Sequence, residues 1–188
     1  MINLSNSMEF DDNVIRVSDA FHGVRVAKLA SMLCNSMNIS DFEKEEIVLS
    51  AVLHDIGKTT IDRNILNKPS KLNNREWQYI KLHPKYGSAI AALMGYSTNI
   101  SKNILYHHEN CDGTGYPIGL KEEYIPIGAA IVRICDSYDA MRTKRPYKKK
   151  FSHKEAIAEL LKENEKYKND LLMSFIKLDF HGIAKYHR

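Results

Sequence analysis

Residues 41–58, DFEKEEIVLSAVLHDIGK, decide the fold, because they combine a helical pattern with a polar end. Apolar side chains recur along this stretch at the spacing of one helix face: Ile47, Val48, Ala51 and Val52. The pattern predicts a helix that begins at about Asp41 and stops at Gly57, a residue type common at helix C-termini. His54 and Asp55 then lie side by side near the end of an apolar helix.

Helical periodicity continues on both sides of this stretch. A long first helix is marked by Val14, Val17, Phe21, Val24, Leu33 and Met37. Later helices are expected over about residues 74–81, 86–94, 99–108, 127–141, 152–166 and 169–178. His83-Pro84 should halt the first of these, and Ser152 with Glu155 forms a capping box. Glycine and proline at 113, 115, 117 and 119 predict an ordered loop over residues 109–124. The expected fold class is all-α, a compact helical bundle.

Composition is that of an ordinary globular domain. The 188 residues are 44% hydrophobic and 27% charged, so we expect one domain over residues 1–188. No apolar run approaches the roughly 20 residues that span a bilayer, and the N-terminus does not resemble a secretory signal. Three cysteines without a CxxC pair favour a reducing cytoplasm: Cys34, Cys111 and Cys135.

The net charge of +4 is too small to indicate binding to duplex nucleic acid. Much of the positive charge lies together, at Lys144, Arg145, Lys148, Lys149 and Lys150. A solvated surface loop is the ordinary interpretation of such a cluster. The alternative is a basic rim that attracts an anionic substrate.

Five of the eight histidines precede residue 109 and lie near expected helix ends: His22, His54, His83, His107 and His108. The other three, His153, His181 and His187, are expected at the surface. An adjacent imidazole and carboxylate, as in His54-Asp55, can ligate a metal, and the carboxylate can bridge two metals. Alone, the dipeptide is weak evidence. His107-His108 is stronger, because two adjacent buried histidines without a partner would be costly.

Two further positions add to this set. His83 precedes Pro84 in a rigid corner between helices, which suits an oriented ligand, although a plain cap residue would look the same. Asp136 is a carboxylate within an apolar stretch, where it needs a cation or several donors. His22, by itself, would more often be a hydrogen-bonded core residue.

Together, these five histidines and two aspartates suffice for two metal ions, with Asp55 as the bridge. Nitrogen and carboxylate ligands without thiolate favour iron, manganese or zinc over calcium or magnesium. Two metals about 3.5–4 Å apart can hold a bridging hydroxide and clamp both oxygens of a phosphoryl transfer. The set therefore predicts hydrolysis of a phosphodiester.

Two motifs resemble those of a known family. His54-Asp55-Ile56-Gly57-Lys58 is similar to the signature of the HD superfamily of metal-dependent phosphohydrolases. His107-His108-Glu109, Asp112-Gly113 and Gly115-Tyr116-Pro117 resemble the HHExxDGxGYP segment of the HD-GYP group. The resemblance covers about residues 20–160, with further helices over about 152–188. It implies an all-α HD-type bundle with an ordered GYP loop.

The resemblance also implies residue roles. His22, His54, Asp55 and Asp136 would hold one metal, and Asp55 would bridge to a second at His83, His107 and His108. The centre would be di-iron or, next, di-manganese, and would hydrolyse cyclic di-GMP, or in some members cyclic GMP-AMP, to a linear dinucleotide. Lys58 would bind the scissile phosphate. Gly113, Gly115, Tyr116 and Pro117 would shape the loop beside the site, and Arg145 would meet a substrate phosphate or base.

Departures from the family pattern concern the pocket rim. Members that bind a third metal carry a glutamate where this chain has Ser18, so two metals are expected. Asn110 and Cys111 replace a basic-aromatic pair, and Glu122 replaces a glycine, which puts substrate identity and rate in question. The GYP loop is linked with partner recognition, and a diguanylate cyclase is the candidate partner. The sequence leaves open whether the chain is a monomer or a homodimer.

Two other functions compete with a cyclic dinucleotide phosphodiesterase. One is an HD hydrolase of another phosphoester, such as a mononucleotide, against which the GYP segment argues. The other is a non-catalytic module that senses the nucleotide or docks on a cyclase. Loss of a ligand residue would favour the latter, and all seven are present.

Overall fold

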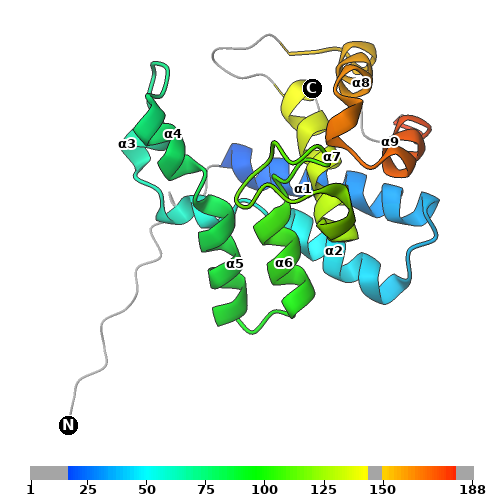
Figure 1. The fold of residues 1–188 in the computed structure, drawn as a ribbon, viewed down its shortest axis with the longest axis horizontal. Coiled ribbons are helices and arrows are strands. Elements are labelled where there is room, and N and C mark those ends of the chain that lie inside the picture. Colours follow the sequence, from blue (N-terminus) through cyan, green and yellow to red (C-terminus); the bar gives the residue numbers. More distant parts are fainter. Residues whose placement is uncertain (1–16, 144–149, 181–188) are drawn as a thin grey trace.

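Helices and loops make up the described part of the chain, residues 17–143 and 150–180 of a computed structural model, in which no strand is formed. The elements, shown in Figure 1, are α1 (Val17–Ser36), α2 (Asp41–Leu53), η1 (Ile56–Thr60), α3 (Arg63–Leu66), α4 (Asn74–Ile80), α5 (His83–Leu93), α6 (Thr98–Tyr106), η2 (Glu122–Tyr124), α7 (Ile127–Arg142), α8 (His153–Lys162), η3 (Asn164–Lys166) and α9 (Asn169–Ile176). The expected all-α fold is confirmed.

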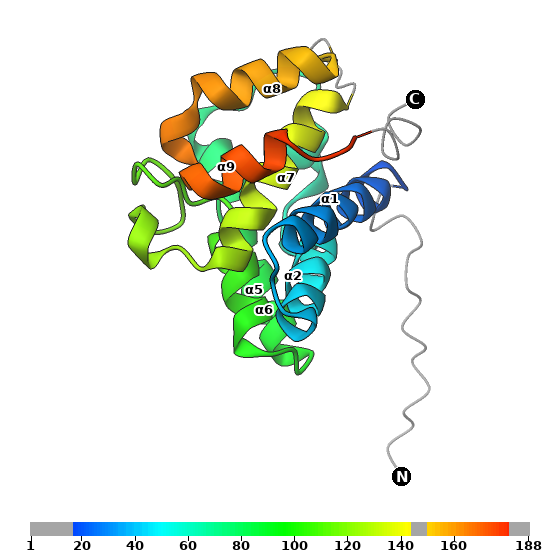
Figure 2. The ribbon, with the colours of Figure 1, turned by 90° about the vertical axis from the view of Figure 1, so that its right-hand side faces the viewer.

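The main core forms where α1, α2 and α7 pack together, with α8 and α9 closing it from the other side (Figure 2). Its largest fully buried side chains include Leu29, Leu33, Ile47, Ile131, Ile134, Leu160, Leu171 and Phe175. A smaller cluster of Ala91, Ile100 and Ile104 joins α5 to α6. Because burial of this apolar area is the main driving force for folding, the two clusters fix the helix ends that surround the site.

The helix starts follow from local capping. Ser40 accepts a hydrogen bond from Glu43 N at the start of α2, so the predicted beginning at Asp41 is confirmed. The capping box at Ser152 and Glu155 is also present, at the start of α8. This helix ends at Lys162, earlier than predicted, and the short turn η3 follows it.

The predicted end of α2 at Gly57 is wrong. The helix ends at Leu53, with His54 as its C-cap, and Gly57 lies inside the tight turn η1. Glycine is needed there for a different reason, since a Cβ on Gly57 would lie 2.0 Å from the carbonyl oxygen of His83. The close approach of these two backbones brings η1 against the start of α5.

The His83-Pro84 corner does end α4 as predicted, but it also opens the next helix. Proline fits the first turn of α5, where a backbone N–H has no partner within the helix, so this helix starts at His83 rather than near residue 86. The four-residue helix α3 was not predicted. The loop over residues 109–124 is confirmed as irregular but ordered, apart from η2 and an isolated bridge between Asp112 and Lys121.

His153 is not a plain surface residue, contrary to expectation. It is half-buried, and its Nδ1 lies 2.8 Å from the hydroxyl of Tyr138. The tertiary packing of α7 against α8 creates this contact, which no local pattern indicates. Within the described ranges, none of the helices has the length and apolar character needed to cross a bilayer.

Replacing Gly57 by alanine should destabilise the protein by about 1–3 kcal/mol, because the added methyl group must push η1 and α5 apart. Urea unfolding of the metal-free protein measures the loss. Thr59→Ala, at an exposed position of the same turn, is the matched control and should cost less. Equal stability of Gly57→Ala and wild type would show that the two backbones are not held in this close approach.

Candidate metal centre

Three histidines in the interior share one local geometry. The Nδ1–H of His54, His83 and His107 donates to the carbonyl oxygen three residues earlier, on Ala51, Ile80 and Ile104, at 2.8, 2.8 and 2.7 Å. Each of these residues lies at a helix terminus, where such carbonyls lack a partner within the helix. The bond fixes the tautomer, and it leaves each Nε2 directed inward as a potential metal ligand.

The seven predicted ligand residues come together in two neighbouring groups. His22, Asp136 and His54 form the first group, from α1, α7 and the end of α2. The second consists of Asp55, His83, His107 and His108. In each group, the possible ligand atoms all lie within 4.8 Å of one another. Helices that are far apart in sequence therefore converge on one buried place, as expected from the sequence.

Asp55 lies between the two groups. Its Oδ2 is 3.4 Å from Nε2 of His54, in the first group, and its Oδ1 is 3.3 Å from Nε2 of His83, in the second. Since the two oxygens of one carboxylate face different histidine groups, this side chain has the geometry of a bridge.

The first group is held by two residues that had not been identified as functional, Asp139 and Arg25. Asp139 is completely buried and accepts a hydrogen bond from Nδ1 of His22 at 2.7 Å. Arg25 binds both oxygens of this carboxylate, at 2.7 and 2.9 Å. One signal was present in the sequence, because Arg25 follows His22, and Asp139 follows Asp136, by three residues, which places each pair on one helix face.

Electrostatics differ between the groups. Burial and the neighbouring histidines hold the pKa of His107 well below its usual value, and burial lowers the pKa of His108 to about 3. Both rings are therefore neutral at pH 7, as a metal ligand must be. Burial also opposes protonation of His22, but its contacts with Asp136 and Asp139 outweigh it and raise the pKa to about 9.

The two carboxylates are kept ionised. Burial alone would raise the pKa of Asp55, but Lys58, His54 and His83 hold it well below its usual value. Burial acts in the same way on Asp136, whose pKa is held well below its usual value by His22 and His54. Ionised carboxylates and the neutral imidazoles of His107 and His108 are donors of the kind that transition-metal sites use.

One buried atom shows that this donor set fits a metal. Nε2 of His54 is enclosed by protein, since the residue is 1% exposed, and it has no hydrogen-bond partner among the described residues. A buried polar nitrogen without a partner is costly. A cation held with Asp55 and Asp136, whose oxygens lie 3.4 and 3.9 Å away, would satisfy it.

Lys58 and Tyr116 flank the centre. The Nζ of Lys58 donates to Oδ2 of Asp55 at 2.6 Å, so this ammonium group lies directly beside the bridging carboxylate. The ring of Tyr116 stacks on His108, with a centroid distance of 4.6 Å, and closes the second group on its outer side. Burial raises the pKa of the Tyr116 hydroxyl well above its usual value, so the phenol stays protonated.

Glu109 holds the loop that carries Tyr116. Its buried carboxylate accepts hydrogen bonds from the backbone N–H groups of Ile118, Gly119 and Leu120, at 2.8 to 3.2 Å. The loop is thus tied to the residue directly after His107-His108. Glu109 belongs to the HHE motif, and its role as an anchor depends on the folding of the loop back onto it.

The glycines and the proline that were predicted to shape this loop determine the path of its backbone. A Cβ on Gly115 would lie 2.3 Å from the backbone nitrogen of Asn110, so the middle of the loop packs directly against its start. Gly113 has a φ of +81°, which glycine tolerates best, and Pro117 follows a cis peptide bond. Arg145 and most of the basic cluster lie outside the described residues.

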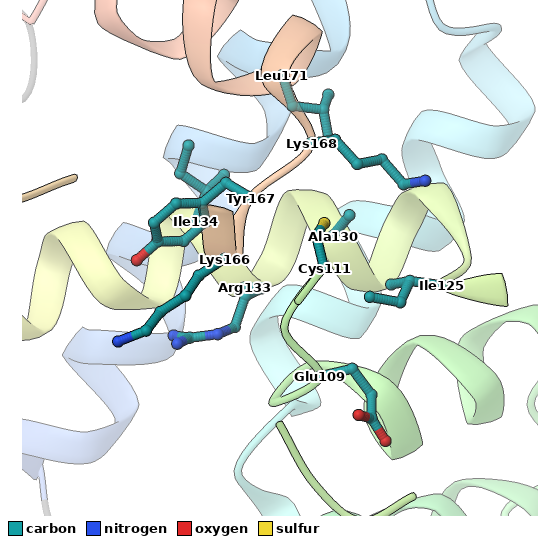
Figure 3. Close-up of a pocket in the computed structure, with 10 residues that line it drawn as sticks. All are labelled: Glu109, Cys111, Ile125, Ala130, Arg133, Ile134, Lys166, Tyr167, Lys168 and Leu171. Atoms are coloured by element: carbon teal, nitrogen blue, oxygen red, sulfur yellow. The ribbon is translucent and has the colours of Figure 1, made fainter. Parts of the chain in front are cut away.

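A separate pocket lies between this loop, α7 and the start of α9 (Figure 3). Cys111, Arg133, Tyr167 and Lys168 are among its lining residues, and none of the seven ligand-type residues lines it. Burial raises the pKa of the Cys111 thiol to about 11, so this thiol is not activated at neutral pH. The candidate site is therefore the histidine–aspartate centre.

The sequence is similar to a known family and to several curated proteins. The model of the HD domain family matches residues 5–171. Cyclic di-GMP phosphodiesterase PA4108 of Pseudomonas aeruginosa is 35% identical over 167 residues, which are 87% of this chain and 40% of that protein. The 3'3'-cGAMP-specific phosphodiesterase 3 of Vibrio cholerae is 33% identical over 77% of this chain and 31% of its own length. The chain thus spans less than half the length of these curated relatives.

Solved structures show the same fold. Bd1817, an HDG"Y"P protein from Bdellovibrio bacteriovorus, superposes with a TM-score of 0.69 at 23% identity, over 84% of this chain and 51% of that one. The family match, which covers far more than half of the sequence, includes every helix that contributes to the two histidine groups. The chain therefore belongs to the HD domain family, with the motifs of its HD-GYP group.

Proposed function

We propose that this chain is a metal-dependent cyclic dinucleotide phosphodiesterase that opens cyclic di-GMP, or alternatively cyclic GMP-AMP, to a linear dinucleotide. The observation that carries the proposal is the position of Asp55, whose two oxygens face two separate histidine groups. A single-metal site would not need a carboxylate so placed. Relatives named as phosphodiesterases of these two substrates support the choice of substrate class.

The ligands follow from the two groups. His22, His54 and Asp136 would hold one ion, and His83, His107 and His108 the other, with Asp55 shared. Iron is the first expectation and manganese the second, because the donors are nitrogen and carboxylate oxygen without thiolate. When bound, the two ions would supply Lewis-acid activation of water and neutralise the charge of the phosphate.

Protein groups would position the substrate around this centre. Lys58 is placed to bind a non-bridging oxygen of the scissile phosphate, since its ammonium group already lies beside the bridging carboxylate. Tyr116, with Gly113, Gly115 and Pro117, would form the wall of the pocket. Arg145 remains a proposed contact to a phosphate or base.

The GYP loop would dock on a partner, with a diguanylate cyclase as the candidate, and the chain would act in the cytoplasm as a monomer or a homodimer. Loop residues Ile118 and Tyr124 are exposed, which is consistent with a docking role.

Metal content and activity should be lost together when the bridge is removed. Protein purified anaerobically should contain about two iron or manganese ions per chain. It should convert cyclic di-GMP to a linear product, followed by chromatography with cyclic GMP-AMP in parallel. His54→Ala and Asp55→Ala should lose metal and lower the rate by at least about 100-fold. His153→Ala, which alters a histidine outside the centre, should keep both.

Other outcomes would select another function. Two metals with no product from either dinucleotide would favour another phosphoester, or a non-catalytic sensor or scaffold. Absence of metal from protein prepared under reducing, metal-replete conditions would contradict the centre itself.

Asp139→Asn should weaken metal binding by about 10- to 100-fold, since the amide keeps the shape but loses the charge that orients His22 and pairs with Arg25. Competition with a chelator measures the affinity. The loss should concern mainly one of the two ions, because Asp139 accepts the hydrogen bond from His22, a residue of the first group. Asp41→Asn, at an exposed aspartate, is the control. Equal weakening of both ions would indicate general unfolding instead.

A further inference from the structure

Beyond the metal centre, a line of aromatic and cationic side chains leads outward from His108. Tyr116 stacks on His108, and the Nζ of Lys81 lies 5.2 Å from the centre of the Tyr116 ring. The same ammonium group lies 5.9 Å from the centre of the Trp77 ring. Lys81 therefore sits between the ring of Tyr116, in the loop, and the ring of Trp77, on α4. The helices α3 and α4 project together from the body of the bundle (Figure 1).

The chemistry of this line is that of a nucleotide site. Trp77 is 45% exposed, so a large part of its side chain is accessible to a ligand. Among the described residues, no carboxylate forms an ion pair with Lys81, and its cationic group contacts only aromatic faces. An aromatic ring can stack with any nucleobase, and an ammonium group binds phosphate.

We propose that Trp77 and Lys81 form a nucleobase subsite: the indole stacks on one base of the bound dinucleotide, and Lys81 contacts the phosphate next to that base. The inference deepens the proposed function and rests on it for the identity of the ligand. The subsite gives a role to the exposed indole of Trp77, which lies six residues before the ligand His83. Both side chains bind substrate, and neither takes part in bond cleavage.

Trp77 is the only tryptophan of the chain, so its fluorescence reports directly on this subsite. The metal-loaded protein is titrated with a phosphorothioate analogue of cyclic di-GMP, with GMP, and with ribose 5-phosphate, which lacks a base. The first two should quench tryptophan emission in a saturable way, and ribose 5-phosphate should not. Calorimetry of the same titrations gives dissociation constants that do not depend on the fluorophore.

Substitutions at Trp77 and Lys81 test separately how ring stacking and positive charge contribute to ligand binding. Trp77→Ala should weaken binding of the analogue by about 5- to 150-fold and raise KM with little change in kcat, whereas Trp77→Phe should restore most of the affinity. Lys81→Met should weaken binding by about 10-fold, and Lys81→Arg should retain it. The matched control is Tyr79→Ala, because Tyr79 is a 58% exposed aromatic residue of the same helix that points away from Trp77.

The possible failures can be told apart. Hydrolysis by the wild type, together with unchanged KM in Trp77→Ala and no quenching, would overturn the subsite and leave the proposed function standing. Quenching by GMP without hydrolysis of either cyclic dinucleotide would keep a nucleotide subsite and overturn the proposed function. Binding of the analogue and GMP that leaves the emission of Trp77 unchanged would exclude stacking on this ring.

Discussion

The shared position of the Asp55 carboxylate is the constraint on which the rest of the site depends. A carboxylate with one oxygen toward His54 and the other toward His83 requires the end of α2 and the start of α5 to meet closely. Gly57 allows that approach, since any side chain there would overlap the carbonyl of His83. Burial of so many titratable groups is costly for a bare protein. The packed helices therefore hold together a buried site whose polar atoms would be best satisfied by cations.

Helix ends orient most of the imidazole rings in the candidate centre. Three of the interior histidines use the same bond from Nδ1 to a carbonyl of the preceding turn, so the backbone itself orients each Nε2. His22, inside α1, cannot use this device and relies on Asp139 and Arg25 instead. The first group is thus held both by the backbone bond of His54 and by the ion pair between Arg25 and the buried Asp139.

The loop after His108 connects the centre to the surface. Glu109 ties it down through three backbone N–H groups, and Tyr116 is thereby stacked against His108. Beyond Tyr116, the ammonium group of Lys81 and the indole of Trp77 extend the site along α4. The candidate metal centre is thus followed by aromatic and cationic side chains, which suit the phosphates and bases of the proposed substrate.

The sequence by itself determined the helical class, the start of α2, the Ser152 cap and the seven residues that converge, because periodicity and motif spacing are local signals. The predicted end of α2 was wrong, because Gly57 does not terminate this helix. A glycine is required there because the backbone of His83 lies too close for a side chain. Only the tertiary structure assigned Asp139, Arg25 and Glu109 to the site and joined Tyr138 to His153. Their partners lie on other elements, and the distance between two side chains on different helices is set by packing, which no local pattern records.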